Sequence, residues 1–289
     1  MPQKLEIDAA EANRRFYRTI AATYDETELA GAHPGARALL DELLRRALSL
    51  VGENPSVLDA CGGSGYVSEM LLRRGIRPVV VDVSSEMLAL WRAKAERLGS
   101  EPEAVESEIL DFLVTDPRTW DVIVFSSALH HLDSPERVVE AAAGRLRPGG
   151  VLVTAFDPPL AVRGDRLLRR LDWVLFQAVH EPREFMRTLA ARLRRSVTDE
   201  PPIGRLAERY AYEGVDDDAL CRLLESRGFE LVVHRRTPDA RLLLVRALLR
   251  LMRRDGAFHL VARRALDSGS AAAEGEDVAV RRSVEGERQ

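Results

Sequence analysis

The stretch PSVLDACGGSGYVSEMLLRRGIRPVVVDVSSEML, residues 55–88, decides the fold of this chain. A short apolar run ends at Asp59, a glycine-rich turn and an amphipathic helix follow, and a second apolar run ends at Asp82. Glycines at 62, 63 and 65 allow a sharp turn and a close approach of a ligand to the backbone, because no Cβ stands in the way. The start of the following helix presents unpaired N–H groups and a positive dipole end, which suit a carboxylate or a phosphate.

Short apolar runs alternate with helical stretches along most of the chain. Runs of strand character occupy residues 55–60, 78–84, 104–110, 120–127 and 151–156, and two more occupy 229–236 and 257–264. This alternation predicts βαβ units and a parallel sheet that is buried on both faces. We therefore predict an α/β fold built on a doubly wound, mostly parallel, seven-stranded sheet of the Rossmann-like type.

The remaining segments are arranged around this core. Residues 1–50 have helical periodicity, 51–157 carry the α/β alternation, 158–212 form an amphipathic helical insert, and 213–266 return to the α/β pattern. The last segment, 267–289, is polar and rich in small residues, and its composition predicts disorder. The 289 residues, 46% of them apolar, fit one large domain with a helical cap.

Composition excludes several classes of protein. The 42 basic and 46 acidic side chains leave a net charge of −4, which argues against a general nucleic-acid-binding protein. No apolar run approaches the ~18 residues of a membrane span, and the first residues lack the apolar region of a signal peptide. Cys61 and Cys221 are too few for a disulfide framework or a zinc cluster. We expect a cytoplasmic protein with a small-molecule partner, and the sequence leaves its oligomeric state open.

Two sequence patterns, each typical of a different nucleotide-like ligand, can be matched to the glycine-rich turn. Asp82 follows Gly63 by nineteen positions and ends the second strand, where a doubly wound fold grips a ribose diol. A dinucleotide pattern, G-x-G-x-x-G/A, requires a small residue at position 68, and Ser68 stands there. The alternative pattern is an acidic residue followed by alternating small residues, Asp59-x-Cys61-x-Gly63-x-Gly65.

The second pattern, with VDVSSEML (81–88) after it and LRPGG (146–150) further on, resembles the class I S-adenosylmethionine-dependent methyltransferases, in particular their small-molecule branch. The resemblance covers residues 16–156 closely and the strands after residue 229 loosely. It implies S-adenosylmethionine as cofactor. No HExxH or similar metal-ligand spacing occurs near the histidines of the sequence, so we expect no bound metal. Asp59 and the turn that contains Cys61, Gly62, Gly63 and Gly65 would hold the methionine part, and Asp82 would take both ribose hydroxyls. The family has glycine at the position of Cys61, so the sequence departs from the family pattern at that turn.

The resemblance also implies roles at the ends of the other strands. Val83 and Met87 would lie against the adenine, and Asp111, with Phe112, matches the acidic position that receives the adenine amino group. Ser126 and Ser127 match the floor beneath the sulfonium. The segment FYRTIAATYD (16–25) resembles the family's lid, with Tyr17 and Tyr24 closing over the cofactor. The same two tyrosines would equally suit a helix packed on the core.

His130 and His131 follow the fourth strand, at the carboxyl edge where α/β sheets hold their ligands. One of them is a candidate general base, because histidine titrates near neutral pH. The alternative is a hydrogen bond that organises the loop. Trp173, Phe176, His180, Phe185 and Met186 of the insert would either line an apolar acceptor pocket or pack the insert on the sheet.

We therefore predict methyl transfer from S-adenosylmethionine to an O, N or C nucleophile of a small organic acceptor, such as a secondary metabolite, a quinone or a lipid-like precursor. Two alternatives stay open. One is an NAD(P)-dependent oxidoreductase of the Rossmann type. The other is a relative that binds the cofactor without catalysing methyl transfer.

Overall fold

The computed structural model describes residues 8–21, 24–27, 34–160, 174, 186, 214–238, 243–252 and 254–266. The predicted tail and nearly all of the predicted insert, with Trp173, Phe176, His180 and Phe185, lie outside the described residues. The strands are β1 (Val57–Ala60), β2 (Val79–Asp82), β3 (Glu103–Glu106), β4 (Trp120–Ser126), β5 (Leu146–Asp157), β6 (Phe229–Thr237) and β7 (Ala257–Arg264). The helices are α1 (Ala9–Ile20), α2 (Tyr24–Thr27), α4 (Pro34–Leu48), α5 (Tyr66–Leu72), α6 (Ser85–Arg97), α7 (Ile109–Thr115), α8 (Pro135–Arg145), α12 (Asp217–Ser226) and α13 (Leu243–Leu251), with a short 3₁₀ turn, η2 (Leu129–His131).

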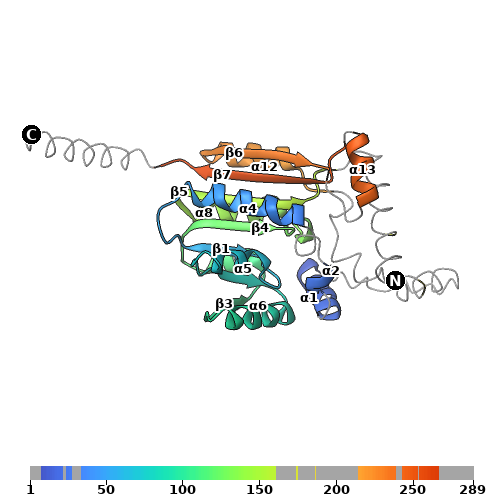
Figure 1. Cartoon of the computed structure of the whole chain (residues 1–289). Helices are drawn as coiled ribbons and strands as arrows, with labels where there is room; N and C mark the ends of the chain where they lie inside the picture. Colours follow the sequence, from blue (N-terminus) through green and yellow to red (C-terminus); the bar gives the residue numbers. More distant parts are fainter. Residues whose placement is uncertain are drawn as a thin grey trace, which may run out of the picture.

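The strands form a single seven-stranded sheet in the order β3-β2-β1-β4-β5-β7-β6, which Figure 1 shows from β3 at the bottom to β6 at the top. The first five are parallel, and β7 runs antiparallel between β5 and β6. The predicted doubly wound α/β fold is confirmed. The strand order reverses between β1 and β4, and folds of this type bind ligands outside the carboxyl ends of the strands at that point.

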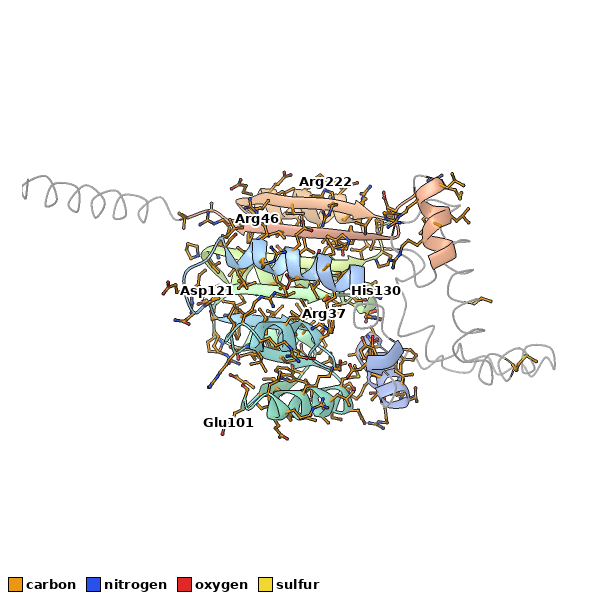
Figure 2. The ribbon with its side chains drawn as sticks, in the orientation of Figure 1. Arg37, Arg46, Glu101, Asp121, His130 and Arg222 are labelled. Carbon is orange, nitrogen blue, oxygen red and sulfur yellow. The ribbon has the colours of Figure 1, made fainter. Side chains whose placement is uncertain are left out.

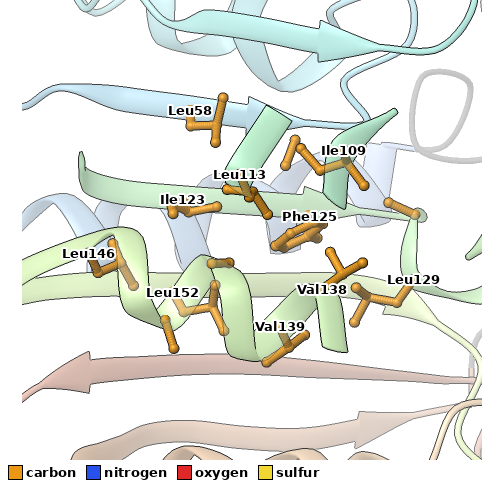
Figure 3. Packing of buried hydrophobic residues seen from close by; sticks show 14 of the residues in the cluster. Leu58, Ile109, Leu113, Ile123, Phe125, Leu129, Val138, Val139, Leu146 and Leu152 are labelled. Atoms are coloured by element: carbon orange, nitrogen blue, oxygen red, sulfur yellow. The ribbon is translucent and has the colours of Figure 1, made fainter. Parts of the chain in front are cut away.

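Both faces of the sheet are covered by helices, as the nearly uninterrupted apolar strands require. Leu58, Ile123, Phe125 and Leu152 face α7, α8 and α12 and form the larger buried cluster, part of which appears in Figure 3. Alternate residues of the same strands face α4 and α5, where Leu40 and other leucines of α4 are fully buried. Because each strand is buried on both sides, its position in the middle of the fold follows from its apolar sequence alone.

The third strand is shorter than predicted. It ends at Glu106, and a helix begins at Ile109, so the strand expected over 104–110 is wrong in its second half. Glu108 caps this helix, since its carboxylate accepts a hydrogen bond from the Asp111 N–H at 2.9 Å. A capping carboxylate satisfies an otherwise unpaired donor in the first turn, which favours helix over strand here.

Strand β5 contains a β-bulge near its carboxyl end. Ala155 pairs with His259 of β7 and Asp157 pairs with Phe258, so Phe156 is an extra residue in β5. Phe156 has φ +63°, in the left-handed region that a side chain rarely adopts. Bulges of this kind re-aim the side chains that follow them.

The two N-terminal helices α1 and α2, which we call the lid, lie beyond the carboxyl ends of the parallel strands (Figure 1). Asp8 caps α1 by accepting a hydrogen bond from the Glu11 N–H at 2.7 Å. Among the described residues, no helix combines the length and the apolar character that crossing a membrane requires.

Candidate functional site

A cavity of about 320 Å³ lies between the lid and the carboxyl ends of β1, β2, β3 and β4. Twelve of the residues predicted for the site line it: Tyr17, Tyr24, Asp59, Cys61, Gly62, Gly63, Asp82, Val83, Met87, Ser126, Ser127 and His131. Four do not: Gly65, Asp111, Phe112 and His130. Figure 2 shows His130 at this edge of the sheet, and Asp121, which lies near the start of β4, at the opposite edge.

The glycine turn brings the backbone up to the cavity wall. Gly63 has φ +54° and Gly65 has φ +76°, so both adopt the left-handed conformation that favours glycine. A Cβ at Gly65 would stand 2.2 Å from a ring carbon of Trp91, so this glycine packs the turn onto α6 rather than facing the cavity. Cys61 adopts φ +56° although it has a side chain. Burial raises the pKa of the Cys61 thiol well above its usual value, which disfavours the thiolate that a nucleophilic cysteine needs.

Asp82 joins the first two strands at the cavity. Its Oδ2 accepts a hydrogen bond from the Gly63 N–H at 2.9 Å, and its Oδ1 accepts one from the Ser84 N–H at 2.9 Å. Burial raises the pKa of Asp82 to about 6, although the backbone N–H donors favour the carboxylate. The carboxylate is therefore fixed in direction and keeps lone pairs for further donors in the cavity.

Asp59 lines the cavity and is almost fully buried. Its Oδ2 accepts a hydrogen bond from the Ser68 hydroxyl at 2.6 Å, and its Oδ1 is buried without a hydrogen-bond partner. Burial raises the pKa of Asp59 to about 7. A buried carboxylate oxygen without a donor is costly in a folded protein, so its position beside a cavity indicates a ligand with a donor or a positive charge.

The acidic residue after β3 that faces the cavity is Glu108. Asp111 is exposed in the first turn of α7, and Phe112 is packed in the larger core cluster, so neither lies where the resemblance would place it. Burial raises the pKa of Glu108. The sequence carries little signal for Glu108 as a cap, because helix N-caps are typically Asp, Asn, Ser or Thr.

The two histidines have different surroundings. His131 lines the cavity, and its Nε2 lies 3.0 Å from the Tyr17 hydroxyl of the lid. His130 is buried, and its Nδ1 lies 2.8 Å from Asp157 Oδ1, which also accepts the His130 N–H at 3.1 Å. The two imidazole rings are 4.0 Å apart between centroids. The structure therefore favours His131 as the histidine that can reach a ligand.

The lid contacts three walls of the cavity. Asn13 Nδ2 donates to the His131 carbonyl at 3.0 Å, and the Tyr17 and Tyr24 rings pack edge to face at 5.7 Å. Asp25 of α2 accepts from the Ser64 hydroxyl at 2.6 Å and from Lys94 Nζ at 2.8 Å. Asn13, Asp25 and Lys94 were not predicted, because such contacts join positions far apart in the sequence.

The cavity wall is predominantly acidic. Six carboxyl groups line it, from Asp8, Asp25, Asp59, Asp82, Glu108 and Asp133, against one arginine, Arg137. A low-dielectric pocket lined by one sign of charge attracts a ligand of the opposite sign. The arrangement therefore suits a ligand that carries positive charge and several hydrogen-bond donors.

A second polar cluster lies where the chain returns from the insert. Asp217 is buried and is bound by Arg236 Nε at 2.7 Å and by His234 Nε2 at 2.8 Å, and Asp218 accepts from Arg236 at 2.8 Å. Asp217, Asp218 and His234 are spaced closely enough to hold a metal ion. Because Arg236 already neutralises both carboxylates, the cluster is better explained as a structural link between α12 and β6.

Comparisons with known proteins find similarity to methyltransferases. Residues 57–150 match the sequence model of the family described as methyltransferase domain. The ubiquinone biosynthesis O-methyltransferase of Aliivibrio fischeri (strain MJ11) is 30% identical over 151 residues, which are 52% of this chain and 63% of that relative. The match thus spans less than two thirds of the relative's length. Within residues 57–150, the chain is therefore similar to proteins with a methyltransferase domain.

Solved structures share the fold at low sequence identity. The N-methyltransferase NodS from Bradyrhizobium japonicum WM9, in complex with S-adenosyl-L-homocysteine, has a TM-score of 0.56 and 15% identity, and the comparison covers 88% of this chain and 98% of that one. The [4+2]-cyclase SpnF has a TM-score of 0.58 and 13% identity, with 90% and 98% covered. A protein described as a cyclase therefore shares the fold, so the fold alone does not define the reaction.

Proposed function

We propose that this protein transfers a methyl group from S-adenosylmethionine to a hydroxyl group of a small organic acceptor. The observation that carries the proposal is the convergence of Asp82 and the unpartnered Oδ1 of Asp59 on one cavity beneath a glycine turn. Methyl transfer to a nitrogen nucleophile is less favoured, because a neutral amine attacks without first losing a proton, whereas a hydroxyl acceptor needs a proton acceptor such as His131.

The described residues fit the cofactor group by group. Asp82 would accept hydrogen bonds from the ribose hydroxyls, and Asp59 would face the positively charged amino group through its free oxygen. Glu108, in place of Asp111, would accept from the adenine amino group, with Val83 and Met87 against the ring. Ser126 and Ser127, at the end of β4, would form the floor beneath the sulfur. These roles account for the acidic wall, since the cofactor carries an ammonium and a sulfonium group.

The protein's contribution to the reaction is alignment, exclusion of water and removal of one proton. S-adenosylmethionine supplies an electrophilic methyl carbon on a positively charged sulfur that leaves as a neutral thioether. The His131 imidazole, whose Nε2 lies 3.0 Å from the Tyr17 hydroxyl in this structure, would accept the proton that the acceptor hydroxyl loses as the methyl group passes from sulfur to oxygen. The lid covers the reacting groups, which favours displacement over hydrolysis.

The acceptor class follows from the site and from the curated relatives together. The relative from Aliivibrio fischeri is described as an O-methyltransferase of ubiquinone biosynthesis. A phenolic hydroxyl of the kind found in quinone precursors is acidic enough for a histidine to deprotonate it during transfer. We therefore propose a phenol or catechol as the acceptor.

Calorimetry with S-adenosylhomocysteine and S-adenosylmethionine tests the cofactor, and NAD⁺ and NADP⁺ serve as controls. We expect binding of both sulfur compounds and of neither dinucleotide, and the reverse result would replace the proposal with an oxidoreductase. Transfer of a labelled methyl group to catechol then tests the reaction. His131→Ala should lower kcat by about a hundredfold, in the usual range for loss of a general base, while the affinity for S-adenosylhomocysteine stays within about threefold. An unchanged kcat would contradict the role of His131.

A further inference from the structure

The β-bulge in β5 decides which face of the sheet Asp157 occupies. Val151, Val153 and Ala155 point to the face covered by α4, and in a regular strand Asp157 would follow them, because side chains alternate with a period of two. Phe156 inserts one residue, joins Ala155 in the α4-side cluster and shifts the alternation. Asp157 therefore points to the opposite face, where its Oδ1 meets the N–H and the Nδ1 of His130.

A single buried histidine of β7 holds this bulge from the side. His259 has no exposed surface, and its Nδ1 accepts a hydrogen bond from the Phe156 N–H at 3.4 Å. Its Nε2 lies 2.9 Å from the Thr237 hydroxyl of β6, and its ring packs edge to face on Phe156 with centroids 5.0 Å apart. The amide of an extra bulge residue has no ladder partner, so a side-chain acceptor is what stabilises it.

The protonation state of His259 suits this arrangement. Burial, with a smaller effect from Arg235, lowers the pKa of His259 to about 4. The ring is therefore neutral in the physiological range and presents one acceptor and one donor. Nδ1 serves as the acceptor for Phe156, and Nε2–H donates to Thr237.

We propose that His259 is a positioning residue for the histidine pair at the cavity, although it lies outside the cavity lining. It holds Phe156 in the left-handed bulge, the bulge aims Asp157 at His130, and His130 packs against His131 with ring centroids 4.0 Å apart. The inference deepens the proposed function. It rests on that function in one respect, namely that His131 is the proton acceptor. A histidine that merely filled the core would affect stability without affecting the His130–Asp157 hydrogen bond.

Three variants of the full chain distinguish a positioning role of His259 from a role in core packing alone. His259→Leu removes both hydrogen bonds at similar volume, His259→Asn keeps an acceptor near Phe156, and Thr237→Val removes only the contact at Nε2. The readout is the downfield proton resonance of the His130 Nδ1–H, measured with S-adenosylhomocysteine bound and assigned by its loss in Asp157→Ala. We expect the resonance to disappear in His259→Leu and to return in His259→Asn. Its persistence in His259→Leu would overturn the proposal.

The kinetic test asks whether His259 acts through Asp157. With catechol as the probe acceptor, His259→Leu should lower kcat by about tenfold, as a misplacement of catalytic groups by less than 1 Å does, and leave the KM for S-adenosylmethionine within about twofold. In an Asp157→Ala background the same substitution should change kcat less than twofold, because coupled residues are not additive. Full additivity would contradict the proposal.

The outcomes distinguish this proposal from the proposed function. If the unchanged protein methylates no acceptor or binds no S-adenosylhomocysteine, the proposed function fails, while the His130 resonance without ligand still decides the role of His259. If His259→Leu does not fold, His259→Phe, which keeps a ring but offers no acceptor to the Phe156 N–H, carries the test. A His130 resonance and a kcat equal to those of the unchanged protein would then overturn the proposal.

Discussion

The two sides of the cavity differ in how they are built. On the side of β1 and β2, the residues that line the cavity lie within one segment of 34 residues, 55–88, and are placed by a strand, a turn and a helix in series. On the side of β4 and β5, the contacts join Tyr17, His131, Asp157 and His259, which come from four separate parts of the chain. The first side depends on local backbone geometry, whereas the second depends on strand pairing and on the docking of the lid.

The largest effect is expected from a substitution that breaks the local side. Gly65→Ala puts a Cβ 2.2 Å from Trp91 at φ +76°, so left-handed strain and overpacking add to each other. We expect a loss of about 3 kcal/mol in the free energy of unfolding, measured by urea denaturation. Gly75→Ala is the matched control, because Gly75 has φ +77° with nothing within 4 Å. A loss at Gly65 no larger than at Gly75 would show that the packing on Trp91 is unimportant.

A smaller effect is expected at the carboxylate that ends β2. Asp82→Ala should weaken S-adenosylhomocysteine binding by about 2.5 kcal/mol, since two hydrogen bonds to a charged group are worth about 1.5–3 kcal/mol each and water replaces part of them. Glu108→Gln should weaken binding less, and Asp111→Asn should leave it unchanged. Calorimetry on the three variants compares them directly. A loss at Asp111 instead of Glu108 would restore the assignment that the resemblance implies.

The pKa of Asp59 predicts a pH dependence of stability. Its folded-state pKa is raised from 3.8 to about 7, so the folded protein binds a proton that the unfolded chain has released. The contribution of the Asp59 carboxyl group to the free energy of unfolding is therefore fully present below pH ~4 and is lost as the pH rises through ~7. Asp59→Asn removes this loss, and at pH ~8 it should stabilise the protein without ligand by on the order of 2 kcal/mol while weakening S-adenosylhomocysteine binding. Parallel stability profiles of the two proteins from pH ~4 to ~8 would contradict the prediction.

The smallest effect concerns the lid. Lys94→Met removes the ion pair with Asp25, whose side chain is 42% exposed, so solvent screens most of the interaction. We expect S-adenosylhomocysteine to dissociate about twofold faster in stopped-flow measurements, with unfolding free energy changed by less than ~0.5 kcal/mol. Arg73→Met, which breaks an exposed pair with Glu69 on α5, is the control and should leave dissociation unchanged.

Whether the sequence alone could place a site residue depends on how close in the chain the contacts lie that orient its side chain. Asp59, Gly63 and Asp82 could be placed from the sequence, because a strand end and a left-handed turn fix their directions within a few residues. Asp111, to which the resemblance gives the adenine amino group, does not line the cavity, because the strand expected over 104–110 gives way to a capped helix that leaves Glu108 at the cavity and Asp111 exposed. His130 and His131 were correctly located at the carboxyl edge, but only the tertiary structure distinguishes the buried one from the one in the cavity.

The sequence by itself determined the doubly wound sheet and the glycine turn, because apolar strands buried on both faces and glycines at positive φ are set by local chemistry. Only the tertiary structure decided that Asp157 reaches His130. That contact depends on one extra residue in β5, Phe156, and on His259 of β7. The hydrogen bond from the Phe156 N–H to His259 Nδ1 joins residues 103 positions apart. No periodicity in β5 encodes a bulge whose acceptor is supplied by another strand.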